Sequence, residues 1–203
     1  MRSKLFAVLL ISVLLAACTQ ENEQKMQSLF NGTDFTNWAE PENNVWWKIN
    51  DGVLSAQHGP EKKGSILWTE KAYTDFVLEL EFKMGDGTVD SGVFLRTDKE
   101  QIQIGISGSL KRDMTCSPYI SGKGYPVEAE GIAELLKEKD WNSMRIKAVG
   151  QNYTVWLNGK KVMAYTSETA VANGPIGLQL HGNREMDVHF RDIKLAEIAV
   201  MAK

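Results

Sequence analysis

The sequence predicts an all-β protein folded as a β-sandwich, and two observations carry this prediction. Short segments alternate apolar and polar side chains, and turn residues separate them at short intervals. The clearest segment is Phe76–Met84, in which every second side chain is apolar and Glu79, Glu81 and Lys83 lie between them. Asn158-Gly159 joins two later segments and is a residue pair typical of a tight hairpin turn. Many short strands with regular turns favour two packed sheets.

The other elements follow from the same reasoning along the chain. A short helix is expected within Ala129–Lys139, where apolar residues recur at helical spacing. A change of apolar parity between Phe190 and Ile193 predicts a β-bulge near Asp192. Residues 107–128 show no periodicity, and a loop of this length in a compact domain is usually functional. Strands are expected at Trp46–Ile49, Val53–Leu54, Ser65–Trp68, Phe76–Met84, Gly92–Thr97, Gln101–Ile106, Trp141–Val149, Tyr153–Asn158, Lys161–Tyr165, Ile176–His181 and Asp187–Ile198.

The N-terminus is typical of a lipoprotein signal peptide, which we assign to residues 1–17. A basic start precedes the apolar run Leu5–Leu15, which is too short to span a bilayer comfortably. Leu15-Ala16-Ala17-Cys18 resembles a bacterial lipobox, so Cys18 is expected to carry the acyl anchor. Thr19 follows it, where Asp would resemble an inner-membrane retention signal. We therefore expect a lipid anchor in the outer membrane, with the protein facing the periplasm or the cell surface.

Composition narrows the remaining possibilities. We divide the rest of the chain into a tether at 18–27, one domain at 28–198 and a tail at 199–203. The chain holds 26 acidic against 23 basic residues and no basic patch, so no nucleic-acid partner is expected. With Cys18 acylated, Cys116 has no disulfide partner and is expected to be a small buried residue. The motifs of zinc proteases, phosphate-binding loops and nucleophile elbows do not occur.

Side chains with sugar-binding chemistry are expected on the outer strand faces. In Ile176–His181, Gln179 and His181 point away from the apolar face, and Gln103 does so in Gln101–Ile106. If the strands are neighbours, the same argument brings Arg96 and Trp156 to this face. Amides, an imidazole, a guanidinium and an aromatic ring match the hydroxyls and the ring face of a sugar. A solvated polar face, a surface ion pair at Arg96 and a core or rim position for Trp156 are the alternatives.

The ordered set of segments resembles the 3-keto-disaccharide hydrolase domain family over residues 28 to about 198. The resemblance implies a concanavalin-like jelly-roll sandwich. It also implies cleavage of 3-keto-disaccharides or other 3-keto-glycosides, as a hydrolase or by a lyase and hydratase sequence. The segments that carry it are Leu29–Trp38, Trp47–Leu54, Asp90–Arg96, Trp141-Asn142, Val155–Gly159 and Gly174–Gly182.

This chemistry suggests a role for each candidate residue. His181 is either the base that removes the proton next to the ketone or a ligand of a divalent metal ion that polarises the ketone. Arg96 is expected to stabilise the enolate. Gln101 stands where many family members have glutamate, which leaves open an altered or lost activity. A non-catalytic carbohydrate-binding module remains the alternative function. The residues expected to bind the substrate are Gln103, Gln179, Asp90, Trp156 and Tyr119.

Overall fold

The computed structural model describes residues 22–23 and 25–199 and confirms the predicted all-β sandwich. The expected signal peptide, the acylated Cys18, most of the tether and nearly all of the C-terminal tail lie outside these residues. Within the described residues, α1 (Ile132–Leu135) is the only α-helix, and a 3₁₀ turn spans Pro60–Lys62. No helix in this part of the chain has the length and apolar character needed to cross a membrane.

Two antiparallel sheets form the sandwich of the described chain. One has nine strands, with β1 (Asn22–Glu23) and β2 (Gln27–Ser28) both paired along β15. The path through its other strands is β13 (Lys160–Thr166), β12 (Asn152–Leu157), β11 (Asn142–Val149), β7 (Phe76–Gly87), β15 (Met186–Ala199), β5 (Val53–Gln57) and β4 (Trp47–Asn50). The second has six strands, in the order β10 (Pro118–Ile120), β9 (Glu100–Gly105), β8 (Asp90–Leu95), β14 (Gly174–Leu180), β6 (Ser65–Tyr73) and β3 (Trp38–Ala39).

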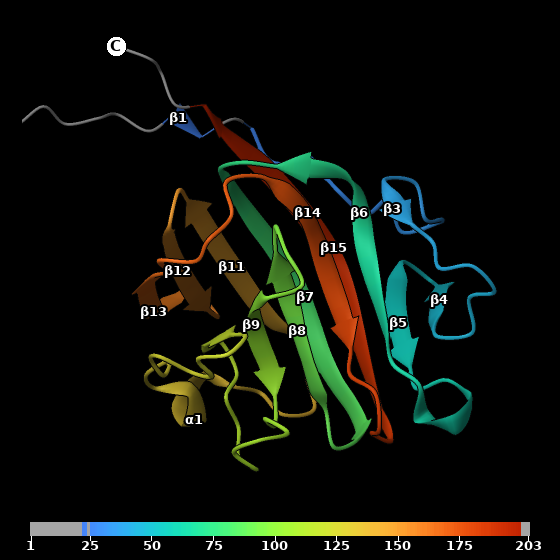
Figure 1. Ribbon diagram of the computed structural model, residues 1–203. Coiled ribbons are helices and arrows are strands. Elements are labelled where there is room, and N and C mark those ends of the chain that lie inside the picture. Colours follow the sequence, from blue (N-terminus) through green and yellow to red (C-terminus); the bar gives the residue numbers. More distant parts are fainter. Residues whose placement is uncertain (1–21, 24, 200–203) are drawn as a thin grey trace, which may run out of the picture.

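The core lies between the sheets because one face of each strand is apolar. Leu78, Leu80 and Phe82 of β7 face inward, and so do Val93 and Leu95 of β8. These side chains are at most 2% exposed, which leaves the polar members of each strand on the two outer faces. In Figure 1, α1 and the loops that follow β9 gather at the lower end of the molecule, whereas β1 lies at the upper end.

The structure confirms the predicted hairpin turn, β-bulge and helix, but the helix is shorter than expected. Asn158 and Gly159 both have positive φ, as a tight turn between β12 and β13 requires. The register of β15 shifts between Arg191 and Lys194, around the positive φ of Asp192, which is the predicted bulge. The helix is only one turn long. The side chain of Asn142 bonds both backbone groups of Lys137 and so competes with further helical turns.

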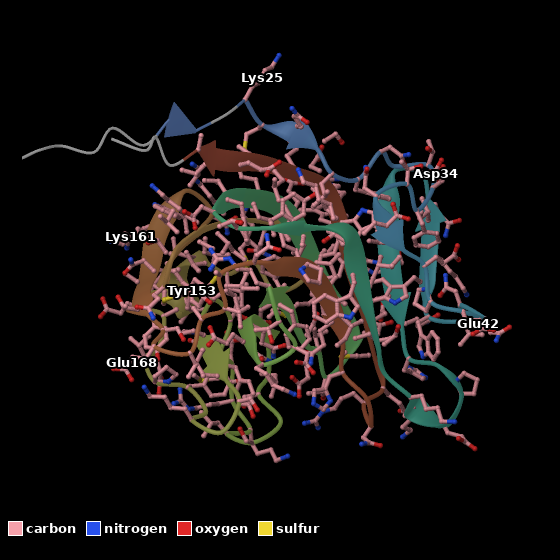
Figure 2. The ribbon with its side chains drawn as sticks, turned by 45° about the horizontal axis from the view of Figure 1, so that its top comes forward. Lys25, Asp34, Glu42, Tyr153, Lys161 and Glu168 are labelled. Carbon is pink, nitrogen blue, oxygen red and sulfur yellow. The ribbon has the colours of Figure 1, made fainter. Side chains whose placement is uncertain are left out.

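A buried carboxylate links the two sheets behind β9. Glu100 is 1% exposed, and its side chain points inward from the six-stranded sheet. It accepts hydrogen bonds from the hydroxyls of Tyr153 at 2.7 Å, Ser167 at 2.8 Å and Thr169 at 2.5 Å. Figure 2 shows Tyr153 inside the sandwich. Because Gln101 follows on the same strand, this link helps to fix the part of β9 that carries the outer polar face.

Candidate functional site

The outer face of the six-stranded sheet has a floor made by two rows of residues in register. One row runs Gln103, Gly92, Gln179, and the other runs Gln101, Phe94, Gly177, Trp68. Glycine is required at Gly177, because a Cβ there would lie 2.7 Å from the Trp68 ring. The missing side chain lets Trp68 and Phe94 stack across it, with ring centroids 5.6 Å apart. The floor is therefore aromatic at one end and polar at the other.

A depression of about 530 Å³ lies over the part of this floor made by Gln101, Gln103, Phe94 and Gln179. Its walls include Ser107, Tyr119 of β10 and Tyr125, all from the segment between β9 and α1. Its other end includes His181 and Arg184. Tyr119 and Tyr125 contact each other edge to face, at 5.3 Å between centroids. Burial raises the pKa of the Tyr125 hydroxyl, which therefore remains a hydrogen-bond donor. The volume lies in the range of small-molecule sites.

A chain of hydrogen bonds orders the polar end of the depression. The Asp90 carboxylate can only accept, so the Gln103 Nε2 amide group donates to it at 2.9 Å. The Gln103 oxygen then accepts from Gln101 Nε2 at 3.0 Å. Arg184 Nη2 lies 3.4 Å from the other Asp90 oxygen. This order leaves the oxygen of the Gln101 side chain pointing away from the chain of bonds.

Two amide oxygens on this face have no hydrogen-bond partner among the described residues. They are Oε1 of Gln101 and Oε1 of Gln179, and both atoms are buried. A buried polar atom without a partner costs about 1–3 kcal/mol, so an unused acceptor is rare in a folded protein. Both oxygens belong to side chains that line the depression.

The imidazole of His181 is exposed at the rim and has a defined tautomer. Its Nδ1 lies 2.7 Å from the carbonyl oxygen of Gly182. A carbonyl oxygen can only accept, so Nδ1 carries the proton. In the neutral ring, Nε2 is then a lone-pair acceptor available to take a proton from a ligand.

The donor set of the depression does not match a metal site made by the protein alone. Its only carboxylates are Asp90 and Asp98, and Asp90 already accepts from Gln103 and pairs with Arg184. Among the described residues, no group of three or more His, Cys, Asp or Glu side chains is placed to hold a metal ion.

Five of the residues selected from the sequence lie together in this depression. They are His181, Gln103, Gln179, Asp90 and Tyr119, and Gln101 lies beside them. They come from β8, β9, β10, β14 and the turn after β14. The strand-face argument correctly brought Gln101 and Gln103 to the same face as Gln179 and His181, because β8, β9 and β14 are neighbours in one sheet.

Arg96 is not on this face, contrary to the sequence-based expectation. β8 ends at Leu95, and Arg96 has a φ of +63°, so the alternation of the strand does not continue to it. Its fully buried side chain donates to the carbonyl oxygens of Gly150 at 2.7 Å and Val171 at 3.1 Å. The guanidinium also lies 3.5 Å from Asp75. Burial lowers the pKa of Arg96, and its contacts join the ends of both sheets.

Trp156 is also far from the depression, because β12 belongs to the nine-stranded sheet. Its ring lies on the outer face of that sheet, beside Arg145. The expectation of one shared face required β12 to neighbour β8 or β14, and it neighbours β11 and β13 instead.

The sequence reasoning missed Arg184 and Tyr125, as well as the stacked pair Trp68 and Phe94. Tyr125 lies in the irregular segment that was expected to be functional, and Arg184 lies in the turn directly after His181. Loops at one end of a sheet converge on the same region, so proximity to His181 was an available clue.

The fold and this depression define a β-sandwich with a concave face that is both polar and aromatic. The family model described as the 3-keto-alpha-glucoside-1,2-lyase-like domain matches residues 25–196. The chain belongs to this family. No curated protein matches the chain.

Solved structures share this architecture. A suspected glycosyl hydrolase from Parabacteroides distasonis ATCC 8503 is 27% identical, with a TM-score of 0.64 over 86% of this chain and 100% of that chain. The carbohydrate-binding module CBM66 from Bacillus subtilis is 13% identical, with a TM-score of 0.54 over 81% of this chain and 98% of that one. The exoplasmic/lumenal domain of VIP36, bound to Ca²⁺ and Man3GlcNAc, is 12% identical, with a TM-score of 0.62 over 90% and 93%. The latter two similarities concern the fold alone.

Proposed function

We propose that the depression binds a 3-keto-disaccharide or another 3-keto-glycoside and cleaves it by elimination followed by hydration. The observation that carries this proposal is the open Nε2 of His181 at the rim of a hollow with two unpartnered amide acceptors. Membership of the 3-keto-alpha-glucoside-1,2-lyase-like family supports the substrate class. The similarity to a suspected glycosyl hydrolase supports cleavage of a glycosidic bond.

The proposed reaction begins with a proton that the ketone makes acidic. His181 Nε2 takes the proton from C2, and the electron pair left behind forms an enolate with the C3 oxygen. The ketone then re-forms, a double bond develops between C1 and C2, and the bond from C1 to the glycosidic oxygen breaks. The leaving oxygen takes the proton back from the imidazolium. Water adds its hydroxyl to C1 and its proton to C2, so the net reaction is hydrolysis.

Arg184 is suited to the role that the sequence suggested for Arg96. Its side chain is 24% exposed, and its contact with Asp90, at 3.4 Å, is long. A guanidinium has five N–H donors, so donors remain for an oxygen that gains negative charge. Gln101 and Gln179 line the depression and can turn their amides toward sugar hydroxyls, and Phe94, which stacks on Trp68, offers an apolar surface to the ring.

Turnover of matched sugars tests this proposal. The purified full-length protein should release product from a 3-keto-disaccharide and none from the parent disaccharide. We expect His181→Gln to lower kcat by about 10²–10⁴ and Arg184→Ala to lower it by about 10²–10³. Thr154→Ala, on the outer face of the other sheet, serves as the control that keeps full activity. Assays with and without a chelator decide whether a divalent metal ion takes part.

If the protein binds the 3-keto-disaccharide and the parent disaccharide but releases no product, it is a non-catalytic carbohydrate-binding module instead. Cleavage at the wild-type rate by His181→Gln would refute the assignment of the base.

We propose that this activity takes place at the outer membrane, because the lipobox-like sequence that ends at Cys18 predicts a lipid anchor. The acyl anchor would hold the domain at the bilayer through the short polar segment after Cys18. Labelling with radioactive palmitate should mark the wild-type protein and leave Cys18→Ala unmarked, and equal labelling of the two would refute the anchor.

A further inference from the structure

A second groove, of about 640 Å³, lies on the outer face of the nine-stranded sheet. It lies on the other sheet from the depression that contains His181, and no residue in the described part of the chain lines both hollows. Its centre is one row of side chains in register across four strands, namely Trp156, Arg145, Glu79 and Lys194. We propose that this groove is a second carbohydrate-binding site, which takes a neutral oligosaccharide and does not cleave it.

The aromatic end of the groove is a platform for a sugar ring. Trp156 is only partly buried, although it is large and apolar. The Arg145 guanidinium lies 5.8 Å from the centre of its ring. At Gly159, which also lines the groove, an added Cβ would meet no atom within 4 Å, so this end is open. A pyranose can stack its apolar side on the face of this ring that the guanidinium does not cover, while its hydroxyls point to the polar row.

The charges that line the groove, together with the neighbouring Arg191, favour an uncharged ligand because three positive groups match three negative ones. Arg145 pairs with Glu79 at 2.5 Å, and Arg191 pairs with Glu81 at 2.6 Å. Asp192 lies 3.8 Å from Arg191, and Lys194 adds a further positive charge. A strongly anionic or cationic ligand would have to break these pairs. Sugar hydroxyls can both donate to the carboxylates and accept from the guanidinium without breaking them.

The shape of the groove follows from two local features of the chain. The bulge at Asp192 interrupts the register of β15 between Arg191 and Lys194 and bends that strand beside the row. The tight turn at Asn158-Gly159 ends β12 directly after Trp156 and Leu157. The groove is therefore bounded by a bulge on one side and opens at a hairpin on the other. Four strands about 4.8 Å apart span roughly 14 Å, enough for an oligosaccharide of two or three rings.

Affinity electrophoresis of the full-length protein tests the proposal without any turnover. The gels contain laminarin, hydroxyethylcellulose, soluble starch or galactomannan as neutral probes, and polygalacturonate as the anionic probe. We expect retardation by at least one neutral polysaccharide and none by polygalacturonate. Trp156→Ala should weaken the retardation about tenfold or more, because loss of an aromatic anchor usually dominates a binding interface. Trp156→Phe should restore part of it.

Two matched variants separate this groove from the depression. Thr154→Ala changes a neighbouring outer-face residue of β12 and should bind like the wild type. Arg184→Ala alters the depression and should also keep the retardation, whether or not the protein cleaves 3-keto sugars. The proposal is overturned if no neutral polysaccharide retards the protein or if Trp156→Ala binds unchanged. It is equally overturned if binding is lost in Arg184→Ala instead, or if Trp156 proves to hold a dimer in sedimentation.

Discussion

Replacing Tyr153 by phenylalanine tests the buried link between the two sheets. Tyr153 and Glu100 are each 1% exposed, and the Tyr153 hydroxyl donates to the carboxylate at 2.7 Å. The change removes one oxygen and leaves Glu100 Oε2 without the only donor seen for it among the described residues. Burial, and next the hydrogen bond to Glu100, raise the pKa of Tyr153 above its ordinary value, so the hydroxyl stays protonated and able to donate.

The expected loss is that of a hydrogen bond to a buried charged group, about 1.5–3 kcal/mol. This is a large part of a total stability of about 5–15 kcal/mol for a domain. With a urea m-value of about 2 kcal/mol/M, the unfolding midpoint should fall by roughly 1 M without a change in slope. Urea unfolding followed by circular dichroism measures both quantities.

Tyr165→Phe is the matched control, because Tyr165 lies directly opposite Tyr153 on β13. Its hydroxyl is 3.4 Å from Lys123 Nζ at the exposed surface. We expect this change to stay within about 0.5 kcal/mol of the wild type. If Tyr153→Phe is equally mild, the hydroxyl does not stabilise the link between the sheets and the reasoning fails.

Three further predictions concern the floor of the depression, the core and the surface. Gly177→Ala should force Trp68 from its stack, cost about 1–3 kcal/mol and change the near-ultraviolet circular dichroism; an unchanged spectrum would contradict the close contact of 2.7 Å. Burial raises the pKa of Cys116, so a thiol reagent should label it only after unfolding, as peptide mass analysis would show. Hydrogen bonds from the Thr36 side chain and backbone lower the pKa of Asp34 below 3.8. The lowered pKa stabilises the folded state above the unfolded value, and this contribution is lost as the pH falls through the folded value. An NMR titration should find the Asp34 midpoint below 3.8, and higher in Thr36→Ala than in the wild type.

The sequence was sufficient for features that depend on near neighbours. Alternation along a strand has a period of two, so it correctly put Gln101 with Gln103 and Gln179 with His181 on outer faces. The tight turn at Asn158-Gly159 also followed from local preferences. The family resemblance supplied the jelly-roll expectation, since periodicity alone predicts a sandwich without its strand order.

The tertiary structure decided which strands share a sheet and where a strand ends. Trp156 alternates as expected, yet long-range pairing places β12 in the nine-stranded sheet. Arg96 turns inward because its positive φ ends β8 and because Gly150 and Val171, distant in sequence, supply the carbonyl oxygens that hold it. Arg184 joins the site through its approach to Asp90, a residue far away in the sequence. Strand faces are set by local geometry, whereas sheet membership and loop contacts depend on partners far along the chain.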